Sequence, residues 1–157
     1  MKYVVTGATG FLGANLVRSL LGAGHSVHCL IRKPNICIEG LDVKLSTTPI
    51  YSKESGHIEA LAEELRDADG IFHVAGIFDP SPGGEARMRT VHVDATASLL
   101  SAAERAKVRR MVLCSSSITV DYGTLESPGN EDSAPDADGM YGTKGALRAY
   151  HDTKADA

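Results

Sequence analysis

The first thirteen residues constrain the fold of this chain more than any other stretch. Residues 3–5 form a short apolar, β-branched run that predicts a buried strand, and glycines follow at positions 7, 10 and 13. From residue 11 to residue 21, apolar side chains recur at helical spacing, which predicts a helix. A strand, a glycine-rich turn and a helix in this order are the context that a nucleotide-binding fingerprint needs.

Each of the three glycines has a mechanical role in such a turn. Gly7 permits a sharp turn off the strand, Gly10 lets the backbone approach a diphosphate, and Gly13 lets the helix pack against the strand. The free N–H groups and the dipole of the helix start then favour an anion. Because the spacing is G-x-x-G-x-x-G and not G-x-G-x-x-G, a glycine turn without a ligand stays open as the alternative.

Strand and helix patterns alternate along the rest of the chain. Strands are predicted at residues 27–31, 41–45, 70–75 and 110–114, helices at 58–65, 88–106 and from 142 onward, and loops at 79–84 and 121–139. This alternation predicts an α/β fold of three layers, with a doubly wound parallel sheet between helices. Ligands of such sheets bind where the strands end, which is where the glycine turn, Arg32, residues 75–76 and residues 115–117 are expected to converge.

Length and composition narrow the class of protein. The 157 residues predict one domain, 1–157, and 16 basic against 20 acidic side chains leave a net charge of −4, which argues against a nucleic-acid partner. No apolar run approaches a membrane span and the chain opens directly into a strand, so we expect neither a membrane segment nor a signal peptide, and a cytoplasmic location. The cysteines lack metal-ligand spacing, which predicts reduced thiols, with Cys29 and Cys114 buried in strands, and no metal site.

Residues 6–13, which read TGATGFLG, resemble the N-terminus of the extended short-chain dehydrogenase/reductase family, also called the NAD-dependent epimerase/dehydratase family. The dihydroflavonol-4-reductase-like branch is the most similar, beside its nucleotide-sugar epimerase cousins. The resemblance implies a Rossmann-type domain and covers essentially all 157 residues. Relatives continue with further strands and a smaller substrate domain, which we expect this chain to lack. A truncated piece and a gene product that lost its tail both stay open.

The end of the second strand bears on the choice of nicotinamide cofactor. NAD-specific sites usually carry an acidic residue there, which accepts from the ribose 2′-hydroxyl. In this chain Ile31 is followed by Arg32 and Lys33, and a guanidinium is suited to hold a 2′-phosphate. We therefore predict NADP, with NAD as the alternative, Arg32 as the main contact and Lys33 as the secondary one. A solvated turn is the other interpretation of these two cations.

The resemblance also implies a set of cofactor-binding positions. They are Gly7, Thr9, Gly10, Phe11, Leu12, Gly13, Arg32, Lys33, Val74, Ala75, Gly76, Ser115, Tyr150 and Lys154. His73, just before Val74, is either part of this loop or an ordinary strand residue. His92 stands where the family usually has Asn. Residues 45–49 lack the family's Asp near the adenine, for which Ser46 or Thr47 could substitute.

For catalysis, the resemblance implies a Tyr acid, a Lys four residues later on the same helical face, and a Ser or Thr after the fifth strand. Tyr150 and Lys154 have this spacing, and Ser117 matches the hydroxyl position, with Ser116 as the near alternative. The segment from Tyr141 to Lys144 resembles the motif but is one residue short. That spacing would turn the Lys away from the Tyr, so Tyr150 and Lys154 are favoured.

Three functions follow from these residues. The first is an NADP-dependent oxidoreductase that reduces an aldehyde or ketone, with a small-molecule carbonyl substrate as partner. The second is a nucleotide-binding module without turnover. The third is a nucleotide-sugar epimerase or dehydratase, disfavoured because such enzymes usually hold NAD. The resemblance also allows a homodimer through the helix at 88–106 and the helix of Tyr150.

Overall fold

The computed structural model describes residues 1–133 and 135–157, which fall into two compact units. The first, here called the sheet unit, comprises Met1–Gly76 and Ala95–Cys114. The second, here called the helical unit, comprises Ile77–Asp94 and Ser115–Ala157. Among the described residues, no helix has both the length and the apolar character to cross a membrane.

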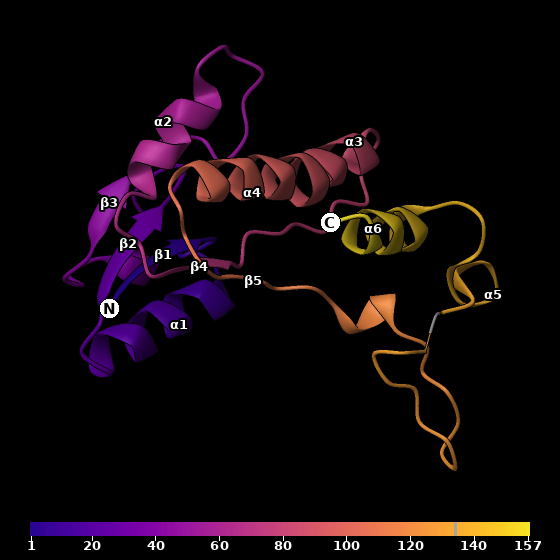
Figure 1. Ribbon diagram of the computed structural model, residues 1–157. Coiled ribbons are helices and arrows are strands. Elements are labelled where there is room, and N and C mark those ends of the chain that lie inside the picture. The colour runs from indigo at the N-terminus through magenta and orange to yellow at the C-terminus, as the bar shows by residue number, and fades with distance from the viewer. Residues whose placement is uncertain (134) are drawn as a thin grey trace. The chain divides into compact units, whose positions relative to one another are not determined.

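The sheet unit is built on five parallel strands in the order β3-β2-β1-β4-β5 (Figure 1). Their bounds are Lys2–Thr6 for β1, Ser26–Leu30 for β2, Lys44–Ser46 for β3, Gly70–His73 for β4 and Met111–Leu113 for β5. The order reverses at β1, between β2 and β4, so the sheet is doubly wound. In such sheets the crevice for a ligand opens at the reversal, beyond the carboxyl ends of the strands.

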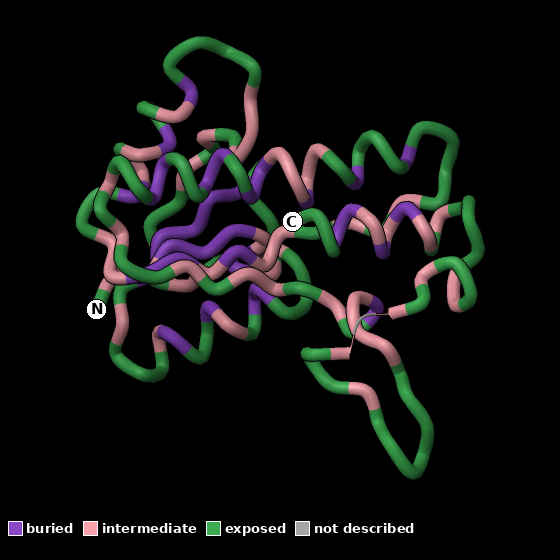
Figure 2. Tube along the Cα trace, turned by 45° about the vertical axis from the view of Figure 1, so that its right-hand side comes forward, coloured by how far each residue is buried: buried purple, intermediate pink, exposed green. Residues whose placement is uncertain are grey.

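Helices cover both faces of this sheet, which confirms the predicted three-layer α/β fold. α1 (Phe11–Gly22) lies on one face, and α2 (His57–Glu64) and α4 (Ala95–Arg105) lie on the other (Figure 1). Neighbouring residues of β1 point to opposite faces, so Val5 packs in the α1 core and Val4 in the α2–α4 core. Buried residues therefore run along the strands, as Figure 2 shows.

The helical unit consists of short helices and loops. Its elements are α3 (Gly84–Arg89), the π-helical turn η2 (Thr90–Asp94), the 3-10 turn η3 (Ser117–Thr119), α5 (Ala137–Tyr141) and α6 (Ala146–Ala155). Arg87 pairs with Asp79 at 2.6 Å in the loop before α3. Arg89 of α3 pairs with Asp156, just beyond α6, at 2.7 Å. These ion pairs link α3 to its own loop and to the end of α6.

Several predicted boundaries in the helical unit are wrong for local reasons. The helix predicted at 88–106 begins at Gly84 and contains the π-helical turn, whose extra residue per turn the apolar spacing does not reveal. The loop predicted at 121–139 includes the start of α5, which Asp136 caps by accepting from the Gly139 N–H. The last helix begins at Ala146, because Gly142 and Gly145 have φ values of 72° and 109° that no helix contains.

In the sheet unit, two apolar positions of α1 are not core residues. Phe11 is 90% exposed and Leu12 is also exposed, because the first turn of α1 packs through Gly13 and leaves its larger side chains facing outward. The third strand begins at Lys44, three residues later than predicted, after a turn in which the Val43 N–H donates to Leu41.

The cysteines also depart in part from expectation. Among the residues that the structure describes, none of the three forms a disulfide. Cys29 is buried in β2, and burial raises the pKa of its thiol to about 11. Cys114 lies one residue beyond β5 and is half-buried, so its predicted place inside the strand is wrong.

Candidate functional site

The glycine turn after β1 is closed by backbone at two of its three glycines. Gly7 has φ +70°, and a Cβ there would lie 2.6 Å from the Ala75 nitrogen. At Gly13, a Cβ would lie 2.1 Å from the Gly7 carbonyl oxygen. The turn thus packs against the chain that follows β4, and the start of α1 packs against the turn. Only glycine is compatible with these two approaches.

Gly10 differs from the other two glycines because the protein leaves space beside it. Chain neighbours aside, the one described heavy atom within 4 Å of a Cβ there would be the Gly7 carbonyl oxygen, at 3.4 Å. Gly10 is also the N-cap of α1, with no side chain capping the helix. The N–H groups of the first helical turn lack intrahelical acceptors, which favours an anion at this end. Packing therefore gives no reason for a glycine here, whereas a ligand that approaches the backbone does.

Thr6 and His73 join the glycine turn to the segment after β4. The Thr6 Oγ1 lies 2.6 Å from the Nδ1 of His73 and accepts the Ala75 N–H at 3.3 Å. The Val74 N–H donates to the Thr6 carbonyl oxygen at 3.3 Å. His73 is fully buried in β4 and serves to tie the two strands together, which agrees with the strand interpretation of this residue. The sequence analysis did not predict this role of Thr6. The signal that was available is a polar residue at the end of an apolar strand.

Arg32 and Lys33 follow β2, the strand beside β1, and both are exposed. Neither forms an ion pair with another residue of 1–133 or 135–157. The glycine turn, these two cations and residues 74–76 thus all follow the carboxyl ends of neighbouring parallel strands, as expected. The cations are available to an anion at that edge of the sheet.

The end of β3 carries a polar cluster that the sequence did not reveal. Ser46 and Thr48 each donate to one carboxylate oxygen of Glu64 at 2.7 Å, and the other oxygen lies 3.3 Å from the His28 Nε2. Partial burial raises the pKa of Glu64, but these hydrogen bonds and the charge of Lys44 lower it overall. Burial, followed by the charge of Lys44, lowers the pKa of His28. Ser46 is therefore engaged with Glu64, and Thr47 is the exposed hydroxyl of this segment.

In the helical unit, α6 carries both Tyr150 and Lys154. Lys154 is four positions after Tyr150, so both lie on the same side of the helix. Tyr150 is half-buried, and Lys154 is only 7% exposed. The Tyr150 ring makes edge-on contacts with Phe78 at a centroid distance of 5.6 Å and with His92 at 5.5 Å. The Tyr150 ring is thus restrained by edge-on contacts with two other rings.

His92, which stands where the family usually has Asn, is hydrogen-bonded on both ring nitrogens. Its Nε2 lies 3.2 Å from the Ile77 nitrogen and its Nδ1 lies 2.9 Å from the Thr153 Oγ1. Burial, and then the positive charge of Lys154, lowers the pKa of His92 to about 4. The imidazole is therefore neutral at physiological pH.

The serines after β5 have different surroundings. Ser115 is exposed, and Ser116 caps the 3-10 turn by accepting from the Ile118 N–H. Ser117 is the first residue of that turn, is exposed, and forms no side-chain hydrogen bond with a described residue. The Ser117 hydroxyl is thus free to meet a substrate, whereas the Ser116 hydroxyl already has a structural role.

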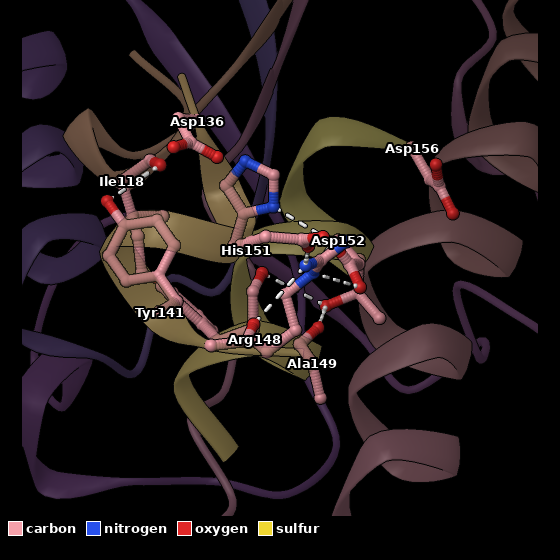
Figure 3. A network of polar contacts seen from close by, with 12 residues as sticks. Ile118, Asp136, Tyr141, Arg148, Ala149, His151, Asp152 and Asp156 are labelled. Carbon is pink, nitrogen blue, oxygen red and sulfur yellow. Dashed lines mark hydrogen bonds and ion pairs between the residues drawn. The ribbon is translucent and has the colours of Figure 1, made fainter. Parts of the chain in front are cut away.

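Tyr141 and Lys144 do not share a helix. Tyr141 is the last residue of α5, and Lys144 lies in the bend between α5 and α6. The Tyr141 hydroxyl donates to the Ile118 carbonyl oxygen at 3.2 Å (Figure 3). Burial and the hydrogen bond with Tyr122 raise the pKa of Tyr141 to about 12. A phenol that is harder to ionise and already bonded to a carbonyl is poorly suited to proton transfer.

A network of ion pairs connects α5 with α6. The Arg148 Nε lies 2.7 Å from an Asp152 carboxylate oxygen, and its Nη1 contacts Asp138 and the Gly142 carbonyl (Figure 3). The same Asp152 oxygen lies 2.9 Å from the His151 Nδ1. Burial raises the pKa of Asp152, but the bonds to His151 and Arg148 lower it overall. The network fixes α6 from the side of α5.

The chain is similar in sequence to a protein family and to several characterised proteins. The family model described as NAD dependent epimerase/dehydratase family matches residues 3–151. Sterol demethylase protein B of Methylococcus capsulatus is 35% identical over 118 residues, which are 74% of this chain and 34% of that protein. A 3 beta-hydroxysteroid dehydrogenase/Delta 5-->4-isomerase of Mycobacterium tuberculosis is 35% identical over 139 residues, which are 83% of this chain and 35% of that protein. Dihydroflavonol 4-reductase of Zea mays is 33% identical over 137 residues, covering 80% of this chain and 37% of that protein.

Solved structures show the same architecture. MoeE5 in complex with UDP-glucose and NAD superposes with a TM-score of 0.75 at 26% identity, over 99% of this chain and 46% of that chain. The yeast methylglyoxal/isovaleraldehyde reductase Gre2 complexed with NADPH gives a TM-score of 0.81 at 20% identity, over 99% of this chain and 50% of that chain. The chain thus spans about a third of the length of the curated relatives and about half of these two structures.

Proposed function

The chain belongs to the NAD dependent epimerase/dehydratase family, as its sequence predicted, and on this premise we propose that it binds NADP(H) to reduce a small-molecule carbonyl compound. The observation that carries the proposal is the glycine turn. Backbone fills the space beside Gly7 and Gly13, while the space beside Gly10 is free at the N-terminus of α1. A dinucleotide diphosphate fits this arrangement, because its charge matches the N–H groups there.

The residues proposed to hold the cofactor come from the strand ends of the sheet unit and, in the helical unit, from Ser115 and α6. The diphosphate is assigned to the turn of Gly7, Thr9, Gly10, Phe11, Leu12 and Gly13, where the Gly10 N–H already donates to the Gly7 carbonyl oxygen at 3.0 Å and the first N–H groups of α1 lack intrahelical acceptors. The remainder of the cofactor is assigned to Val74, Ala75, Gly76, Ser115, Tyr150 and Lys154. The exposed side chains of Phe11 and Leu12 are no obstacle to this role, because their contribution is a backbone N–H.

The preference for NADP rests on Arg32. This guanidinium is exposed, has no carboxylate partner among the described residues, and follows Ile31 where NAD-specific sites place an acid. It can therefore donate two hydrogen bonds to a 2′-phosphate, with Lys33 adding charge. The family itself is compatible with either cofactor, since MoeE5 is described with NAD and the yeast reductase with NADPH.

The catalytic groups are Ser117, Tyr150 and Lys154. In this proposal the Ser117 hydroxyl donates to the carbonyl oxygen of the substrate and orients it. Tyr150 gives its phenol proton to that oxygen, and the ammonium of Lys154 stabilises the resulting phenolate until water returns the proton. A bound NADPH would supply the hydride to the carbonyl carbon, and together with the proton from Tyr150 this would give the alcohol and NADP⁺. The Phe78–Tyr150–His92 contacts support Tyr150 as the acid, because they hold its ring in one orientation.

The assignment of Arg32 is tested by titrating the chain with NADPH and NADH, following nicotinamide fluorescence. Arg32→Ala should weaken NADPH binding about tenfold or more and leave NADH binding nearly unchanged, since a hydrogen bond to a charged group contributes about 1.5–3 kcal/mol. Arg109→Ala removes the same charge from another exposed position and is the matched control. An unchanged NADPH/NADH affinity ratio in Arg32→Ala would remove the basis for NADP.

A binding module without turnover is the second candidate function. The chain spans about a third of its curated relatives, so the matched region does not include all the segments those proteins have. Reduction of any aldehyde or ketone by this chain separates the two candidates. A nucleotide-sugar epimerase is disfavoured by the pair Ile31–Arg32. The cytoplasmic location and the homodimer stay predictions.

A further inference from the structure

The helical unit contains a buried histidine to which the proposed chemistry gives only a ring contact with Tyr150. His92 lies in the π-helical turn Thr90–Asp94 and is 1% exposed. A polar ring buried to this extent requires hydrogen-bond partners, and π-helical turns occur frequently at functional sites. The hydrogen-bond partners of His92 show which segments of the helical unit it connects.

The hydrogen bonds of His92 run in one direction. The backbone N–H of Ile77 can only donate, so the Nε2 that it contacts at 3.2 Å must be an unprotonated acceptor. In a neutral imidazole the proton is then on Nδ1, which donates to the Thr153 Oγ1 at 2.9 Å. The Thr153 hydroxyl in turn donates to the Ala149 carbonyl oxygen at 2.8 Å. The Thr153 hydroxyl also lies 3.3 Å from the Tyr150 carbonyl oxygen, so it donates within α6 and accepts from His92.

The chain of bonds ends between the two proposed catalytic residues of α6. Thr153 lies three residues after Tyr150 and one before Lys154, so a bond to its side chain fixes the rotation of α6 about its axis. The same imidazole makes an edge-on contact with the Tyr150 ring at 5.5 Å. One residue therefore restrains both the helix and the phenol. An apolar ring of equal size would keep the contact with the Tyr150 ring but could not form the hydrogen bond to Thr153.

We propose that His92 is a positioning residue, whose neutral Nδ1–H tautomer links Ile77 to Thr153 and so orients Tyr150 and Lys154 for proton transfer. The inference rests on the proposed function for Tyr150 and adds a role for a residue that touches neither substrate nor cofactor. It also accounts for the departure from Asn at this position, because the imidazole accepts and donates on opposite sides of a ring that additionally packs against Tyr150.

The test combines a spectroscopic measurement with a pair of conservative variants. In the wild-type chain at pH 7, the ring ¹⁵N resonances of His92 should show a protonated Nδ1 and an unprotonated Nε2. Thr153→Val keeps the branched shape but removes the acceptor, and we expect kcat/KM for carbonyl reduction to fall about 10- to 100-fold, the scale of a misplaced catalytic group. Thr153→Ser restores the hydroxyl and should regain most of the loss.

The possible results distinguish the proposed function from the proposed role of His92. A wild-type chain that reduces no carbonyl compound contradicts the proposed function. An Nε2-protonated or doubly protonated His92 contradicts the linkage itself. Full activity in Thr153→Val, or equal losses in Thr153→Val and Thr153→Ser, would overturn the positioning role. His92→Phe retains the ring contact with Tyr150 and should be as impaired as Thr153→Val.

Discussion

The glycine turn of the sheet unit and the Tyr150 region of the helical unit are held in different ways. In the turn, backbone packs on backbone, and positions 7 and 13 admit no side chain at all. Around Tyr150, side-chain contacts hold the structure, through the His92–Thr153 bond, which joins residues 61 positions apart, and the Arg148–Asp152 ion pair within α6. The proposed diphosphate site is shaped by the backbone, so it depends on glycines at two positions. The orientation of the proposed catalytic helix depends on individual side-chain contacts, each of which a single substitution can remove.

The largest effect is expected where backbone meets backbone. Gly13→Ala places a Cβ 2.1 Å from the Gly7 carbonyl oxygen, and neither atom can move without opening the turn. We expect a loss of about 3 kcal/mol or more in the free energy of unfolding, measured by urea denaturation. Gly22→Ala is the control in the same helix, because, apart from the adjoining helix backbone, no described heavy atom lies within 4 Å of a Cβ at that position. It should shift stability by less than about 1 kcal/mol, in the stabilising direction. Equal losses in both would contradict the close packing of the turn.

Tyrosine variants test the side-chain-held region. Tyr150→Phe removes the proposed acid and should lower kcat about 10²- to 10⁴-fold, the usual contribution of general acid catalysis. Tyr141→Phe removes the hydrogen bonds to Ile118 and Tyr122 but no proposed catalytic group, so turnover should persist while stability falls by about 1 kcal/mol. Steady-state kinetics with thermal unfolding of both variants decides between the two tyrosines. Loss of turnover in Tyr141→Phe alone would reverse the assignment.

The smallest effect is expected at the Glu64 cluster, and it depends on pH. The pKa of Glu64 is lower in the folded chain than in the unfolded one, so its contribution to stability is present above about pH 5, past the ordinary carboxyl pKa. This contribution is lost as the pH falls through the lowered folded pKa. Glu64→Gln should therefore be less stable than the wild type at pH 6, and the difference should shrink toward pH 3. A difference that stays constant over this range, measured by urea denaturation, would argue against an ionised Glu64.

The sheet unit was predictable because its signals are local. Alternating strands and helices, with a glycine turn at residue 7, predict a three-layer, doubly wound parallel sheet with right-handed crossovers. The errors there are those of local geometry. Phe11 and Leu12 match the helical apolar period, but a small residue at position 13 brings α1 close to the turn and leaves both side chains exposed.

The surroundings of the candidate catalytic residues could be predicted only in part. The Tyr150–Lys154 spacing is visible in the sequence, but the partners that restrain it are 61 residues away, as in the bond of His92 to Thr153. The π-helical turn also breaks the 3.6-residue period on which the prediction of one long helix depended. Likewise, the Ser46–Glu64 bond joins a strand end to the end of a helix, which no pattern within either segment indicates.

The central claim is that the open space beside Gly10 receives a dinucleotide diphosphate, and NADPH titration of the wild type and of Gly10→Ala tests it most directly. The claim predicts NADPH binding in the wild type that weakens about 10-fold or more in Gly10→Ala, because the added methyl group occupies the place of the ligand. Thermal unfolding without NADPH should be nearly the same for both, since, chain neighbours aside, the described heavy atom nearest to the added methyl group lies 3.4 Å away. Equal NADPH affinity in the two proteins, or no binding by the wild type, would contradict the account.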